Sequence, residues 1–118
     1  MNDKEFMRNM LERNRIMKRN EDLIEALEMA EDIDSNIEAS LVRRIVSDYQ
    51  RLIQLTDEAV DYTKQEITKL EEMARENSYT NPELDEFIIR YRISLGRMTE
   101  YDELIDEQVQ SLKKEYNI

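Results

Sequence analysis

The sequence predicts an all-α protein built around a long antiparallel helical hairpin. The chain of 118 residues contains one Gly and one Pro, which leaves too little turn chemistry for a many-stranded sheet. Charged residues make up 38% of the chain, a proportion typical of long helices. Apolar residues also recur at alternating spacings of four and three over two long segments, which indicates helices that pack along a shared seam.

The N-terminal segment, about residues 3–33, is predicted to be helical. Within "MKRNED", Lys18 and Arg19 suit the end of one helix and Asn20 suits the start of another, so the segment is either one helix or two nearly collinear helices. Its apolar residues are expected to cover the hairpin. They are Phe6, Met10, Met17, Leu23, Leu27, Ala30, Ile33 and Ile37.

The first helix of the hairpin is predicted at about residues 36–76. Ser35 and Glu38 have the spacing of a capping box, in which the side chain of the first residue caps the helix. The four-three spacing defines a seam along this helix. Its residues are Val42, Val46, Tyr49, Ile53, Thr56, Val60, Thr63, Ile67, Leu70 and Ala74.

The second helix is predicted at about residues 82–116, with Asn81 as its N-cap and Pro82 in the first turn. Gly96 lies inside this helix, and we expect it to allow a close backbone approach or a slight kink. The seam of this helix consists of Leu84, Ile88, Tyr91, Leu95, Met98, Asp102, Ile105, Val109, Leu112 and Tyr116.

Folding the chain about Tyr79 brings the two seams together in a single register, with Thr56 opposite Asp102. A carboxylate in an apolar seam is destabilising unless it is hydrogen-bonded, and the Thr56 hydroxyl is a suitable donor. Thr56 and Asp102 are therefore predicted to fix the register, as a seam Asn does in coiled coils.

One flank of this hairpin is apolar, whereas the other places Lys64 beside Arg92 and Glu71 beside Asp85, like charges that prefer water. A long apolar flank requires a cover. The N-terminal segment would supply it in a three-helix bundle, and a second copy would supply it in a dimer of hairpins. Both arrangements make residues 1–118 a single helical domain.

Composition excludes several functional classes. The chain lacks His and Cys, which excludes Ser-His-Asp and Cys-His catalysis, Cys/His zinc sites and disulfides. It also has no Gly-rich phosphate loop, and we predict no cofactor, metal site or catalytic residue. No apolar run approaches the ~18 residues of a membrane span, and no signal peptide is recognisable, so we expect a soluble cytoplasmic protein.

The net charge of −11 is unevenly distributed. Residues 1–19 carry six basic and three acidic side chains, whereas the remainder is strongly acidic. Direct binding to nucleic acid is not expected, because phosphates require clustered Lys and Arg.

Residues 21–38 contain eight carboxylates and no basic side chain. Four of them, Glu21, Glu25, Glu28 and Asp32, form a stripe opposite the apolar face of the predicted helix, and we call them the acidic stripe. A solvated helix face is one interpretation. Like charges at i, i+4 are nevertheless unfavourable, by ~0.2–0.5 kcal/mol each, so a source of positive charge is expected. It is either the chain's own bases (Arg13, Arg15, Lys18 and Arg19), within one molecule or across a dimer, or a basic partner protein.

We therefore predict a non-catalytic protein-binding module that uses the acidic stripe to engage a partner with a basic surface. Small adaptors, assembly chaperones and inhibitors from bacteria or their viruses have this character. One alternative is a DNA-mimicking decoy that blocks a nucleic-acid-binding protein. A second follows from Glu25-x-x-Glu28 and Glu58-x-x-Asp61, which resemble the acidic motifs of all-α, magnesium-dependent nucleotide pyrophosphohydrolases. That resemblance implies a carboxylate-only magnesium hydrolase in which facing helices supply the oxygen ligands.

Overall fold

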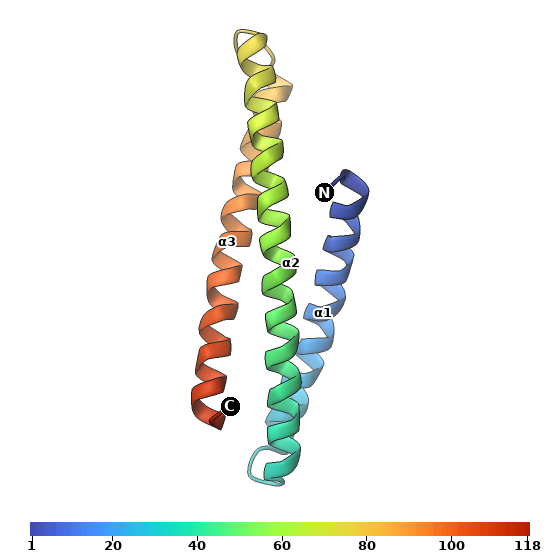
Figure 1. Ribbon diagram of the computed structural model, residues 1–118, viewed down its shortest axis with the longest axis vertical. Coiled ribbons are helices and arrows are strands. Elements are labelled where there is room, and N and C mark those ends of the chain that lie inside the picture. Colours follow the sequence, from blue (N-terminus) through green and yellow to red (C-terminus); the bar gives the residue numbers. More distant parts are fainter.

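The computed structural model describes all 118 residues and contains three helices and no strand. They are α1 (Asp3–Ala30), α2 (Ser35–Glu76) and α3 (Pro82–Tyr116), arranged in an elongated molecule of 64 × 25 × 19 Å (Figure 1). The predicted all-α hairpin with an N-terminal helical segment is confirmed. None of the helices carries an apolar stretch long enough to cross a membrane.

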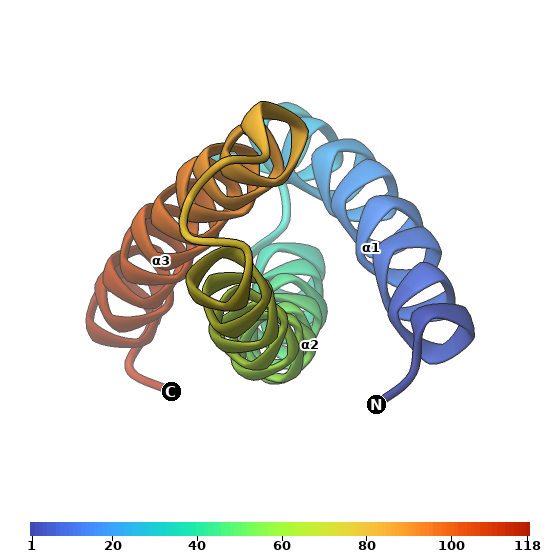
Figure 2. The ribbon, with the colours of Figure 1, turned by 90° about the horizontal axis from the view of Figure 1, so that it is seen from above.

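The central helix is α2, whose backbone lies close to those of both other helices, whereas the backbones of α1 and α3 do not approach each other. Both run antiparallel to α2, and Figure 2 shows them leaning away to different sides of it. The three helices therefore form an open arrangement around α2 and not a closed triangle.

The packing of α2 against α3 follows the predicted seam. All ten seam positions on each helix are buried or half-buried, and Val42, Ala74 and Val109 are at most 2% exposed. The Tyr49 hydroxyl of α2 donates to Gln108 Oε1 of α3 at 2.7 Å, between residues that folding the chain about Tyr79 brings level. The four-three spacing was thus a correct guide to this interface.

The N-terminal segment forms one continuous helix, so "MKRNED" does not mark a helix end. The side of α1 that faces α2 also has four-three spacing, but it runs through polar residues. It consists of Phe6, Asn9, Arg13, Ile16, Asn20, Leu23, Leu27 and Ala30, all buried or half-buried. The expectation that Ile33 and Ile37 cover the hairpin is wrong, because they lie beyond the end of α1 and are 79% and 50% exposed.

Side-chain caps define the ends of the hairpin helices. The Asn81 side chain accepts hydrogen bonds from the backbone N–H groups of Glu83 and Leu84, as predicted. The predicted cap Ser35 is wrong by one residue. Asp34 caps α2 instead, because its carboxylate carries a full charge and accepts from the first free N–H groups at 2.9 and 3.2 Å.

The N-terminal helix covers only part of the hairpin. Phe6 stacks on Tyr62 with ring centroids 4.7 Å apart, and the Tyr62 hydroxyl donates to Asp3, so α1 begins level with Tyr62. Beyond that point the apolar flank is open, and Met73 and Phe87 are 49% and 52% exposed.

The other flank differs from the expectation of like-charge neighbours. Arg92 of α3 forms an ion pair with Glu71 of α2. A long arginine side chain can reach along the interface to the opposite charge, so this flank contains an attractive contact that the sequence did not predict.

Gly96 lies in open space. No atom outside the local helix backbone lies within 4 Å of the position that a Cβ would occupy, so the expected close backbone approach is wrong. The residue leaves α3 with a flexible point that packing does not require.

Gly96→Ala should therefore raise the free energy of unfolding by about 0.5–1 kcal/mol, measured by urea denaturation, because Ala has the higher helix propensity and no neighbour resists its methyl group. Gly96→Val is the control and should give a smaller gain, since a β-branched side chain loses rotamer freedom in a helix. A Val variant less stable than wild type would reveal a steric conflict and contradict the prediction.

Candidate functional site

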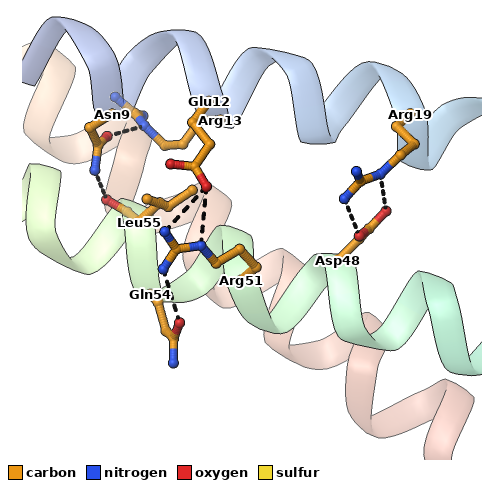
Figure 3. A network of polar contacts seen from close by, with 8 residues as sticks. All are labelled: Asn9, Glu12, Arg13, Arg19, Asp48, Arg51, Gln54 and Leu55. Atoms are coloured by element: carbon orange, nitrogen blue, oxygen red, sulfur yellow. Dashed lines mark hydrogen bonds and ion pairs between the residues drawn. The ribbon is translucent and has the colours of Figure 1, made fainter.

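Ion pairs attach α1 to the solvent-exposed edge of α2 (Figure 3). The Arg19 guanidinium donates to both carboxylate oxygens of Asp48, at 2.6 and 3.0 Å. The guanidinium of Arg51 on α2 donates to Glu12 on α1 at 3.2 and 3.3 Å. In the first pair the arginine belongs to α1, and in the second it belongs to α2. Both pairs form in the same alignment of the two helices.

A second set of contacts is buried. Asn9, 5% exposed, donates from Nδ2 to the backbone oxygen of Leu55 at 2.8 Å and accepts from Arg13 Nε at 2.7 Å (Figure 3). Desolvation lowers the pKa of Arg13, and the nearby Tyr101 opposes this effect. Asn9 thus satisfies its own amide and orients Arg13, which makes this polar part of the interface internally complete.

All four residues of the acidic stripe are exposed. Glu21, Glu25 and Glu28 lie on the C-terminal half of α1, and Asp32 lies in the α1–α2 connection with a left-handed φ of 61°. The five ion pairs of the structure include none of the four. Their charges are therefore not compensated within the molecule.

The basic side chains of the chain itself were one expected source of positive charge for the acidic stripe. They either bond to other residues or form no ion pair. Arg13 is bonded to Asn9 and Arg19 to Asp48. Arg15 and Lys18 are exposed and form no ion pair. Since α1 is one continuous helix, its basic half cannot fold back onto its acidic half.

A row of apolar hollows lies between α1 and α3, over α2, and we call it the α1–α3 groove. Its three hollows have volumes of about 280, 230 and 220 Å³. The first is lined mainly by Phe6, Phe87 and Tyr91, and the second by Met17, Asn20, Leu52 and Tyr101. Ile24 and Tyr49 line both the second and the third, which also includes Leu27, Ile45 and Leu112. Glu21 of the acidic stripe lines the second hollow, so stripe and groove adjoin.

Asn20 is the polar residue of the groove that sequence reasoning missed. It is 2% exposed, and neither its Nδ2 nor its Oδ1 makes a hydrogen bond of full geometry. The Asn20 amide group nevertheless lies toward the Tyr49 hydroxyl: burial raises the pKa of Tyr49, and hydrogen bonding from Asn20 opposes this rise. Oδ1 has no such neighbour, and a buried amide oxygen without a partner is unfavourable by about 1–3 kcal/mol, so this position stands out in an otherwise satisfied interface. A search of α1 for four-three spacing that admitted polar as well as apolar residues would have predicted Asn20 as a core position.

Thr56 and Asp102 lie on the seam between α2 and α3, but the expected hydrogen bond between them is not formed. Thr56 is fully buried, and neither its Oγ1 nor Asp102 Oδ1 makes a hydrogen bond. Asp102 lies beside Asp57, the exposed neighbour of Thr56. Beside the exposed Asp57 the carboxyl stays half-buried, whereas contact with the fully buried Thr56 hydroxyl would desolvate it further. Their role in fixing the register stays a prediction.

Partial burial raises the pKa of Asp102 to about 7, with smaller contributions from a hydrogen bond to Asp57 and from the charges of Asp57 and Asp106. Two carboxyls in contact resist simultaneous ionisation, so one proton is retained into the neutral range. This pair links the α2–α3 interface to pH.

A hollow of about 470 Å³, larger than the three of the groove, lies at the turn end of the hairpin and not at the acidic stripe. Two acidic residues (Glu71 and Asp85) and two arginines (Arg75 and Arg92) line it, and Glu71 is paired with Arg92. Its mixed charges favour no single class of ligand, and we base no site on its size.

The two acidic motifs that resemble magnesium-binding motifs do not face each other. Glu25 and Glu28 lie near the end of α1, level with the start of α2, whereas Glu58 and Asp61 lie near the level of the α1 N-terminus. All four are exposed, and no group of three or more carboxylates is close enough to hold a metal ion. The facing arrangement that the resemblance implies is not formed.

The chain matches no known protein-family model, no curated protein and no solved structure.

Asp102→Asn should raise the free energy of unfolding at pH 8 by on the order of 1–3 kcal/mol. The carboxyl titrates near ~3.9 in the unfolded chain and at about 7 in the folded one, so the native state binds more protons between these values. The stability contributed by protonated Asp102 is complete below about pH 4 and is lost as pH rises through 7. Urea denaturation from pH 5 to 8 should show this decline in the wild type and a flatter profile in the variant.

Asp61→Asn is the matched control, because it removes the same charge from an exposed position of α2. Its stability should follow the wild-type pH profile. Parallel profiles for wild type and Asp102→Asn would contradict a shared proton at the Asp57–Asp102 pair.

Proposed function

We propose that this chain is a non-catalytic protein-binding module whose acidic stripe engages a partner with a basic surface. The single observation that carries this proposal is the uncompensated charge of Glu21, Glu25, Glu28 and Asp32, which enter none of the ion pairs, while Arg13 and Arg19 are held by Asn9 and Asp48. A surface kept free of counter-charges attracts a basic protein at long range and favours correct partners over acidic ones.

The mechanism is electrostatic capture on a rigid element. α1 is held against α2 by apolar contacts of Ile16, Leu23 and Leu27, so the stripe is presented at fixed spacing. Glu21, Glu25 and Glu28 succeed one another at four and three residues, which aligns them along one face over about 10 Å. A partner with Lys or Arg at a similar spacing can meet all of them at once.

Neutralising the stripe as Glu21→Gln, Glu25→Gln, Glu28→Gln and Asp32→Asn should reduce partner capture at least tenfold at 50 mM salt, because the charges supply the attraction. Immobilised wild type and variant are compared in a cell extract at 50 and 200 mM salt, with bound protein quantified by mass spectrometry. The difference between them should shrink at the higher salt, where screening weakens the wild type.

The matched control removes four exposed, unpaired acids from α2, as Glu58→Gln, Asp61→Asn, Glu72→Gln and Glu76→Gln, with the same change in net charge. Capture by this control should equal that of the wild type. Equal loss in both variants would make the effect one of net charge and reject the stripe as a site. Release of the partner by added DNA would instead favour a decoy for a nucleic-acid-binding protein.

A further inference from the structure

We propose that the α1–α3 groove binds a basic amphipathic helix of the partner, which would lie along α2 as a fourth helix. This inference rests on the proposed function, since it names the kind of segment that the acidic stripe engages. It adds a second contact surface that the stripe alone does not require.

The shape of the groove fits a helix. Its hollows are lined by all three helices. The second and third adjoin at Ile24 and Tyr49 and extend along α1 from Met17 to Leu27, roughly 15 Å, and the first lies separately beside Phe6. A helix of about 20 residues, roughly 30 Å long, would reach from the first hollow to the third. Apolar side chains at i, i+3, i+4 and i+7 of a docked helix enter successive hollows of such a groove.

Charge complementarity selects a basic occupant. Among the residues that line the three hollows, the charged ones are Glu21 and Arg90, and Arg90 is paired with Glu86. Glu28 lies seven residues after Glu21 and therefore on the same face of α1. A helix in the groove would thus place its flank beside unpaired carboxylates, where Lys or Arg is favourable and Glu is unfavourable.

The amide oxygen of Asn20, which has no partner, is an independent indication that the groove has an occupant. Asn20 is 2% exposed and lies in the wall of the middle hollow, whereas Asn9, at the equivalent type of position on α1, has its partners. A polar core residue of the docked helix, such as Asn or Gln, would donate to this oxygen. Paired amides at a core position fix register between helices in this way.

A second copy of the chain fits the groove less well than a foreign basic helix. Each copy carries a net charge of −11, and Arg13 and Arg19 are held by Asn9 and Asp48, which leaves only Arg15 and Lys18 of the bases in residues 13–19 to meet the four acids of another copy's stripe. Two such acidic molecules repel each other at low salt.

The probe is a fluorescently labelled synthetic helix of about 20 residues, with Leu at its core-facing positions, one central Asn and Lys on both flanks. Its counterpart has Glu in place of Lys. Fluorescence polarisation at 50 mM salt should show the Lys peptide binding at least tenfold more tightly than the Glu peptide. Equal binding of both peptides would overturn the charge argument and the proposal.

Two groove variants test the location. Ile24→Asp places a charge in the shared wall of two hollows, and Ser111→Lys places a bulky cation at an exposed groove position where folding is not at risk. Both should weaken Lys-peptide binding at least tenfold, with helix content checked by circular dichroism. Ile93→Asp, at an exposed apolar residue outside the groove, is the control and should bind as the wild type does.

The role of Asn20 is tested with a peptide whose central Asn is replaced by Leu. Wild type should prefer the Asn peptide, and Asn20→Leu should prefer the Leu peptide, a reversal that a purely structural role of Asn20 would not produce. The same preference in both proteins overturns this pairing.

Failure of this inference is distinguishable from failure of the proposed function. If neutralising the stripe weakens Lys-peptide binding while Ile24→Asp and Ser111→Lys do not, the groove is rejected and the stripe stands. If neither kind of variant has an effect, both are rejected. Light scattering that shows a dimer of the free chain, converted to a monomer by Ile24→Asp, assigns the groove to a second copy and overturns the foreign helix.

Discussion

The packing of α2 on two sides is the constraint on which the rest of the structure depends. One side, through Val42, Val46 and Tyr49, meets α3, and a second side, through Ile45, Leu52 and Leu55, belongs to the same core and continues toward α1. The backbones of α1 and α3 each lie close to α2 and not to each other, so α2 positions both of them. The acidic stripe and the α1–α3 groove both exist because two helices are attached to a third without closing on each other.

The four-three spacing predicted the α2–α3 hairpin well because nearly every seam position there is apolar or aromatic. The same spacing on α1 was hidden, since Asn9, Arg13 and Asn20 occupy positions where a search for apolar residues expects Leu or Ile. Local chemistry predicted the Asn81 cap and missed Asp34, which competes with Ser35 one residue away and wins through its charge. Side-chain partners such as Asp57 for Asp102 depend on hydration across the interface, which a linear sequence does not reveal.

Polar residues on the side of α1 that faces α2 explain how this helix is attached to α2 without packing against α3. Asn9, Glu12 and Arg19 provide directional contacts that set its alignment on α2, and Asn9 also holds Arg13. Buried polar contacts of this kind favour one register at the expense of stability. The helix is therefore aligned by its basic N-terminal half, and its acidic C-terminal half is left available.

Because the acidic half of α1 has no counter-charges, its carboxylates repel one another in the free protein. Glu21–Glu25 and Glu28–Asp32 are like-charge pairs at i, i+4, each unfavourable by ~0.2–0.5 kcal/mol, and no ion pair of the structure relieves them. A basic ligand that bound beside them would reduce this repulsion and could donate a hydrogen bond to the Asn20 amide oxygen, so part of its binding free energy would come from unfavourable interactions already present in the free protein. By linkage, such a ligand would also stabilise the attachment of α1 to α2, because it binds the folded arrangement alone.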